Sequence, residues 1–70
     1  MSILRKLLTD QDFQDAVEQE SSIRVFSDNQ IIEHRAIVVR FDETKVITQS
    51  NVSDLTYHKR GQCEFFLLKD

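Results

Sequence analysis

Four consecutive residues, Tyr57-His58-Lys59-Arg60, form the group in this chain with the clearest capacity for chemistry. An aromatic ring can stack on a nucleobase, and neighbouring cations can hold phosphate groups. The same four residues would also fit the end of a β-hairpin, with Tyr57 facing the core and the polar side chains facing solvent. The pattern therefore indicates either a nucleic-acid contact or a solvated hairpin end.

Residue types that support catalysis or metal binding are few. Cys63 is the single cysteine, and it could act as a nucleophile only beside a base that His34 or His58 would supply through folding. Its largely apolar neighbours oppose activation of the thiol, so a structural role is favoured. The histidines and the thiol lack zinc-ligand spacing, and no glycine-rich loop is present to bind phosphates. We expect no enzyme activity, no metal and no cofactor.

Length and composition predict one small domain spanning residues 1–70. A domain of this size buries only about 60% of the surface that its unfolded chain exposes, so we expect a homo-oligomer to add stability. The sequence contains neither a signal peptide nor an apolar run of the ~20 residues that a membrane helix needs. A lone cysteine without an export signal indicates a cytoplasmic protein that does not engage a membrane.

The net charge of −3 is unevenly distributed along the chain. Residues 10–20 carry five acidic side chains and no basic one, whereas residues 21–70 carry seven of each. An acidic segment followed by a neutral one is not the footprint of a general nucleic-acid-binding protein. The distribution still allows a local basic patch on the neutral segment.

A helix start is the clearest structural signal. Thr9 and Asp12 have the spacing of a capping box, and they predict a main helix over about residues 10–20. In one straight helix, the apolar side chains before Thr9 and those after it would lie on opposite sides. The sequence therefore predicts a break at Thr9, with a turn or a second short helix before it.

The rest of the chain alternates in short β-type runs joined by polar turns. The longest run spans residues 31–41, in which Ile37, Val39 and Phe41 share one face and other apolar side chains share the opposite face. The polar residues 33–35 interrupt this run and predict a bend or bulge. We predict an α+β fold in which one or two N-terminal helices precede a curved antiparallel meander of four to five strands. A small barrel of the Sm or SH3 type is one form of that fold.

The order of several motifs resembles a known family. The residues concerned are Phe13, Ala16, Glu20, Phe41-Asp42, Val52-Ser53 and Tyr57-His58-Lys59. Over residues 9–65 this order resembles the Hfq family of bacterial Sm-like RNA chaperones. The resemblance implies an N-terminal helix on a bent five-stranded barrel that assembles edge to edge into a ring and binds single-stranded RNA. The RNA-binding residues would be Tyr57, His58, Lys59 and Arg60.

A protein-interaction or inhibitor module, such as a small regulator of phage or plasmid type, is the alternative function. It would act through the acidic helix, with Asp15 and Glu18 at the contact, or through the terminal strand at residues 63–68. That strand could pair with the edge of a partner's sheet. A self-associating dimer with Phe65 and Leu67 at its interface is a third interpretation.

Overall fold

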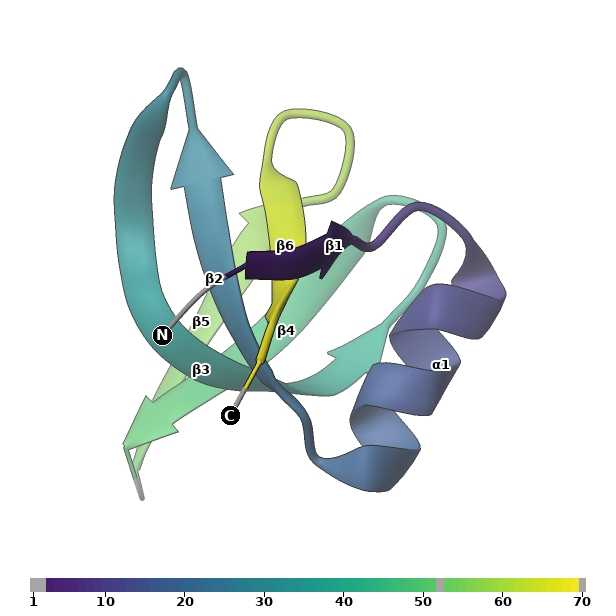
Figure 1. Ribbon diagram of the computed structural model, residues 1–70. Coiled ribbons are helices and arrows are strands. Elements are labelled where there is room, and N and C mark those ends of the chain that lie inside the picture. Colours follow the sequence, from purple (N-terminus) through teal and green to yellow (C-terminus); the bar gives the residue numbers. More distant parts are fainter. Residues whose placement is uncertain (1–2, 52, 70) are drawn as a thin grey trace.

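The structure is a computed structural model, and it describes residues 3–51 and 53–69. In chain order its elements are β1 (Ile3–Lys6), α1 (Asp10–Gln19), β2 (Ser22–Ser27), β3 (Gln30–Phe41), β4 (Lys45–Asn51), β5 (Asp54–Lys59) and β6 (Glu64–Leu68). The strands form one antiparallel sheet in the order β1-β6-β2-β3-β4-β5 (Figure 1). The predicted small α+β class is confirmed.

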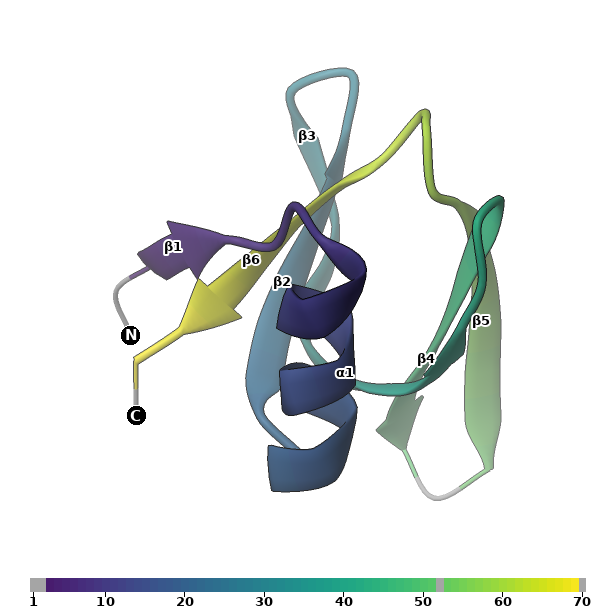
Figure 2. The same ribbon diagram turned by 90° about the vertical axis from the view of Figure 1, so that its right-hand side faces the viewer.

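The sheet is strongly curved. Strands β2 to β5 form a four-stranded meander, and β6 then returns to pair with the other side of β2. Figure 2 shows β1 and β6 on one side of the molecule and β4 and β5 on the other, with α1 between them. Among the strands that the structure describes, β5 and β6 do not pair, so the sheet remains open.

The segment before Thr9 is a strand, so the predicted second helix or turn was wrong. β1 pairs antiparallel with β6 and places Lys6 opposite Phe66. The backbone N–H of Leu7 extends this contact by donating to the carbonyl of Phe65 at 2.8 Å. Pairing satisfies the backbone groups along one side of β6, which a short helix would leave as a free edge.

The predicted break at Thr9 and its capping box are confirmed. The hydroxyl of Thr9 accepts the N–H of Asp12 at 3.1 Å, and the Asp12 carboxylate accepts the N–H of Thr9 at 3.1 Å. The same carboxylate accepts the N–H of Leu8 at 2.9 Å. At the other end, Glu20 adopts the left-handed conformation (φ 50°, ψ 44°) and closes the helix.

The interruption predicted within the long strand is a bulge in β3. Between the pairs that Ala36 and Glu33 form with β2, β3 contains one more residue than its partner strand. The side chain of Arg24 donates from Nε to the carbonyl of His34 at 3.1 Å. This contact satisfies a backbone acceptor at the irregularity and fixes the bend.

A further bulge in β3, on the side that pairs with β4, changes which side chains face the core. Val38 pairs with Thr48, whereas the next registered residue of β3 is Arg40, which leaves Val39 as the extra residue. Phe41 therefore returns to the inner face and does not share a face with Val39 as the simple alternation predicted. Its ring lies 5.6 Å from that of Phe13.

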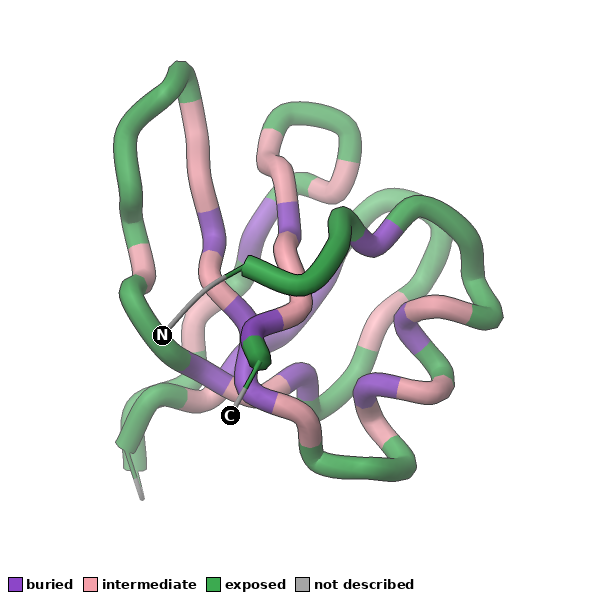
Figure 3. The backbone as a smooth tube through the Cα atoms, viewed as in Figure 1, coloured by how far each residue is buried: buried purple, intermediate pink, exposed green. Residues whose placement is uncertain are grey.

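The core lies inside the curve of the sheet, beneath α1 (Figure 3). Its fully buried apolar cluster contains Leu7, Phe13, Ala16, Ile23, Val25, Val38, Val46 and Phe65. The rings of Phe13 and Phe65 meet edge to face at 5.5 Å, which joins the helix to β6. No helix in the described part of the chain has both the length and the apolarity to cross a membrane.

Candidate nucleic-acid interface

The pleat of β5 separates the four residues predicted to form one site. Successive side chains of a strand point to opposite faces, so Tyr57 and Lys59 share the outer face while His58 lies on the inner face. The ring of Tyr57 is 67% exposed, whereas His58 is only 5% exposed. Tyr57 does not face the core, as a solvated hairpin end would require. The outer pair alone is available to a ligand.

Arg60 is held in the structure and does not extend into solvent. Its guanidinium lies over the ring of Phe13, 4.6 Å from the centroid, and 5.7 Å from that of Phe41. It also donates to the carbonyl of Asp42 at 2.8 Å and pairs with the carboxylate of Asp10 at 2.8 Å. Only 17% of the Arg60 side chain is exposed. Its contacts join α1 to the chain just after β3. Its predicted RNA contact does not fit this position.

His58 belongs to a buried polar group with Glu33 and Thr48, which we call the inner triad. Nε2 of His58 lies 2.9 Å from Oε1 of Glu33 and 3.0 Å from Oγ1 of Thr48, and the hydroxyl of Thr48 donates to the same Glu33 oxygen. The His58 ring also meets Phe65 edge to face at 5.8 Å. Because Thr48 is fully buried, this Glu-His-Thr group is closed to a substrate. It links β3, β4 and β5, and it places His58 inside the molecule, away from the outer face that carries Tyr57 and Lys59.

The outer side of the same three strands forms a different surface, which we call the Tyr57 face. Its members are Arg40, Lys45, Ile47, Leu55, Tyr57 and Lys59. Lys45 pairs with Lys59 across β4 and β5, and Tyr57 pairs with Ile47, which in turn pairs with Arg40. Lys59 lies two residues from Tyr57 on β5, Lys45 lies opposite Lys59, and Arg40 lies two strands away. The three cations therefore share the outer face with the Tyr57 ring, although the residue directly opposite Tyr57 is Ile47.

The six members of the Tyr57 face carry three positive charges and no negative one, and the carboxylate of Asp42 lies beside them just after β3. Within the described residues neither Arg40 nor Lys59 forms an ion pair, and Lys45 has a long contact of 3.7 Å with Asp42. Two like charges placed opposite each other, as in Lys45 and Lys59, repel and are stabilised by an anion between them. This surface can therefore bind anionic groups beside an aromatic platform.

The turn that positions Arg40 and Lys45 is fixed by Asp42. Its carboxylate accepts the backbone N–H groups of Thr44 and Lys45, each at 2.8 Å, and the hydroxyl of Thr44 at 3.1 Å. The hydrogen bond from the Thr44 N–H, together with the other donors, lowers the pKa of the Asp42 carboxyl. Asp42 therefore stays ionised and holds the end of β3 against the start of β4.

The predicted protein-contact residues occupy mixed positions. Glu18 is exposed and Asp15 half-buried on α1, where each carboxylate accepts a hydrogen bond from a glutamine side chain one turn earlier. Phe65 is 2% exposed and lies inside the core, whereas Leu67 is half-buried and packs against the core. Strand β6 pairs with β1 on one side and β2 on the other, which leaves it no free edge.

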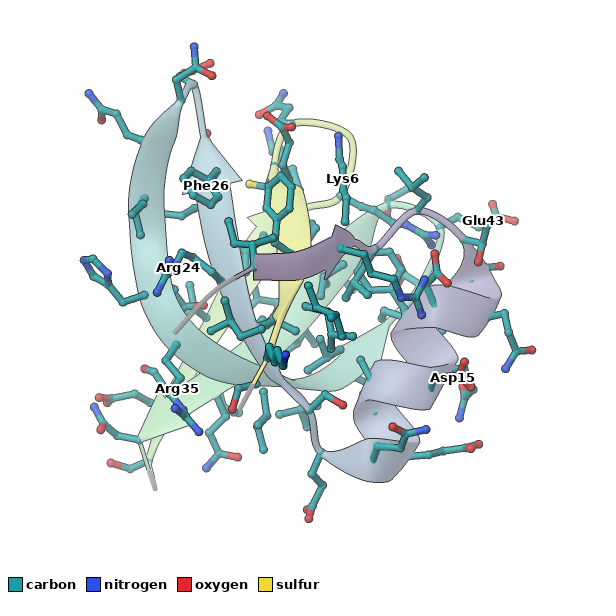
Figure 4. The ribbon with its side chains drawn as sticks, in the orientation of Figure 1. Lys6, Asp15, Arg24, Phe26, Arg35 and Glu43 are labelled. Atoms are coloured by element: carbon teal, nitrogen blue, oxygen red, sulfur yellow. The ribbon has the colours of Figure 1, made fainter. Side chains whose placement is uncertain are left out.

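The outward phenylalanine of β6 is Phe66, which was not among the predicted interface residues. Its ring stacks edge to face on Phe26 of β2 at 5.2 Å. Figure 4 shows Phe26 with Arg24 and Lys6 on the side of the sheet turned toward the viewer. The exposed Leu4 and Ile31 lie on the strands that flank this pair.

Two signals in the sequence would have located the Tyr57 face. The period of two already implies that Tyr57 shares a face with Lys59 and not with His58. Arg40 and Lys45 flank the predicted turn at residues 42–44, and a turn brings its two flanks onto adjacent strands. Glu33 and Thr48 gave no comparable signal, because their contact depends on the bulged register of β3.

No family model matches the chain, and comparisons with curated proteins and with solved structures also return no match. Within the described residues, no three His, Cys, Asp or Glu side chains are grouped as a metal site requires. Val52, which the Sm-like resemblance uses, lies outside the described residues. The resemblance itself stays a prediction.

Proposed function

We propose that this protein is a non-catalytic, cytoplasmic binding module that holds single-stranded RNA on its Tyr57 face. The observation that carries the proposal is that Tyr57, 67% exposed, lies on an outer sheet face whose charged members are the three cations Arg40, Lys45 and Lys59. Stacking on the ring needs a base whose face is free, which a duplex does not offer. The cations Arg40, Lys45 and Lys59 would bind the phosphates on either side of that base.

Features of the fold support an Sm-like form of this module. A helix precedes five strands, β3 is long and bulged, and β6 returns to the side of β2 away from β3. The proposed homo-oligomer would join through the outer strands β1 and β5, because β6 is already paired on both sides. Light scattering on a sizing column, with and without a short U-rich RNA, measures the number of subunits.

Titration of a fluorescently labelled U-rich RNA, followed by anisotropy, tests the proposal. Tyr57→Ala should weaken binding about tenfold, the cost of losing one stacked base. Lys59→Ala should weaken binding and also reduce the dependence of affinity on salt by about one phosphate contact.

Matched controls exist elsewhere on the chain. Leu8 is as exposed as Tyr57, at 67%, so Leu8→Ala removes a similar exposed side chain from another surface. Lys69→Ala removes the same charge as Lys59→Ala from the far end of the chain. Neither control should change affinity by more than about twofold. Equal affinities for Tyr57→Ala, Lys59→Ala and the unaltered protein would rule out this face as the RNA site.

The Phe26–Phe66 pair supports a second candidate, a protein-interaction module. Aromatic side chains on an outer sheet face, flanked by exposed aliphatic ones, are typical of protein contacts. If a second copy of the chain is the partner, Phe66→Gln should lower the mass measured by light scattering, while Tyr57→Ala should leave it unchanged. An unchanged mass for Phe66→Gln would remove this surface from the assembly.

A further inference from the structure

A groove of about 640 Å³ adjoins the Tyr57 face. It is lined by Ser22, Arg35, Ala36, Ile37, Gln49, Ser50 and Asn51. The buried Ala36 and the half-buried Ile37 give it an apolar part, whereas the remaining lining residues are polar or basic. An apolar floor with a polar rim is the usual composition of a site for a small ligand group.

The groove and the Tyr57 face belong to one continuous surface. Leu55 of β5 pairs with Gln49 of β4, Gln49 pairs with Ile37 of β3, and Ile37 pairs with Ser22 of β2. This row runs beside the row that contains Tyr57. The two rows are two residues apart along β4 and β5, which corresponds to roughly 7 Å, and three residues apart along β3 because of the bulge at Val39. The nucleotide next to one stacked on Tyr57 would therefore reach the groove.

The polar rim has the chemistry of a nucleotide contact. Amide side chains such as those of Gln49 and Asn51 can both donate to and accept from the edge of a base. The hydroxyl of Ser50 can likewise donate to or accept from a ribose 2′-OH. A guanidinium such as that of Arg35, which Figure 4 shows beside this end of the sheet, suits a phosphate.

The rim is also held in place. The side chain of Asn51 donates from Nδ2 to the carboxylate of Asp54 at 2.7 Å, across the β4–β5 pair. This hydrogen bond orients the Asn51 amide, because only its NH2 group can donate to the Asp54 carboxylate. The Oδ1 atom of Asn51 is then directed away from Asp54.

We propose that this groove binds the nucleotide adjacent to the base on Tyr57 and that its hydroxyl and amide groups select ribose over deoxyribose. The inference rests on the proposed function, since it assumes RNA on the Tyr57 face. The two parts act differently: the cations of the Tyr57 face set the salt-dependent affinity, while the groove sets the preference for RNA. A 2′-OH that gains one hydrogen bond in the groove should favour RNA by about tenfold.

The test compares a short oligouridine with the oligodeoxyuridine of the same length. The unaltered protein should bind the RNA about tenfold more tightly. Ser50→Phe fills the groove and should weaken binding of both oligonucleotides, RNA more than DNA, so that the tenfold preference for RNA is lost. Gln14→Phe adds the same ring to the exposed side of α1 and should leave the preference intact.

The outcomes separate the two proposals. If neither oligonucleotide binds, or if Tyr57→Ala leaves both affinities unchanged, the proposed function fails. If both bind equally to the unaltered protein, or if Ser50→Phe keeps the preference for RNA, the groove has no such role. Ser50→Ala, which adds no bulk, should reduce the preference severalfold, so the comparison remains decisive if Ser50→Phe does not fold.

Discussion

Single residues divide the chain into an inner polar group and an outer binding surface that share strand β5. His58 closes the inner triad, while its neighbours Tyr57 and Lys59 lie on the other side of the strand. Each buried side-chain nitrogen and oxygen in the described ranges has a hydrogen-bond partner. The inner triad thus joins three strands. Its hydrogen bonds offset the free energy of removing its polar side chains from water, and they hold the outer residues in register.

Removing one member of the inner triad should destabilise the protein strongly. Glu33→Leu removes the carboxylate that both Thr48 and His58 contact and leaves these two groups only each other as partners, so the free energy of unfolding should fall by about 1–3 kcal/mol. Urea denaturation followed by circular dichroism measures this change. Glu43→Leu replaces an exposed glutamate in the β3–β4 turn and should change stability by no more than about 0.5 kcal/mol. A similar loss in both variants would show that the triad contributes nothing specific.

Asp12 should make stability depend on pH. Hydrogen bonds from the N–H of Leu8, then from that of Thr9 and from Arg5, hold the pKa of the Asp12 carboxyl well below its usual range. Because the pKa is lowered in the folded state, this stabilisation is complete above the unfolded value of about 3.9 and is lost as the pH falls below it. Urea midpoints measured from pH 7 to pH 2 should fall more steeply for the unaltered protein than for Asp12→Asn.

The matched control for this pH dependence is Asp15→Asn. The Asp15 carboxylate accepts a hydrogen bond from the side chain of Gln11, not from backbone N–H groups at the helix start. Its replacement should leave the slope of stability against pH close to that of the unaltered protein. If Asp12→Asn and the unaltered protein lose stability in parallel on acidification, the capping carboxylate does not supply the pH dependence.

At the scale of elements, local signals could be predicted and distant pairings could not. The helix start depends on Thr9 and Asp12, three residues apart, and the bend in β3 depends on a polar interruption within the strand itself. Strand β1 pairs with β6 at the other end of the chain, so its short apolar segment was as compatible with a helix as with a strand. The same holds for the candidate site. Strand alternation, which is local, places Tyr57 and His58 on opposite faces. The strand register that brings Arg40 and Lys45 onto the face of Tyr57 depends on pairing between strands.

Strand β1 should protect β6 from unwanted pairing. Deleting residues 2–6 exposes one edge of β6 and removes the ion pair between Lys6 and Glu64, whose atoms lie 3.1 Å apart. The shortened chain should be less stable and should show a molecular mass that rises with concentration in light scattering. The double variant Lys6→Ala, Glu64→Ala removes the ion pair and keeps the strand, so its mass should match that of the unaltered protein. A shortened chain with unaltered mass and stability would mean that β6 needs no such cover.

Across the whole molecule, acidic and basic surfaces are separated. The outer side of α1 carries Asp15 and Glu18, and Figure 4 shows Asp15 projecting from the helix. The Tyr57 face carries three cations although the chain has a net charge of −3. The molecule extends only 27 Å along each principal axis, so the helix lies within two or three Debye lengths of RNA bound to that face. An acidic surface at this distance repels the same phosphates that the basic face attracts.

Neutralising the helix should therefore strengthen RNA binding. At low salt the double variant Asp15→Asn, Glu18→Gln should bind a U-rich RNA up to about twofold more tightly, since two charges within the 27 Å extent of the molecule contribute roughly 0.2 kcal/mol each in water. The gain should disappear at high salt, because the Debye length near 1 M is about 3 Å. Anisotropy titrations at two salt concentrations measure both effects.

If the acidic helix were itself a contact for the RNA or for a protein that delivers it, the same substitutions would weaken binding at both concentrations. The direction of the change thus separates long-range repulsion from direct contact.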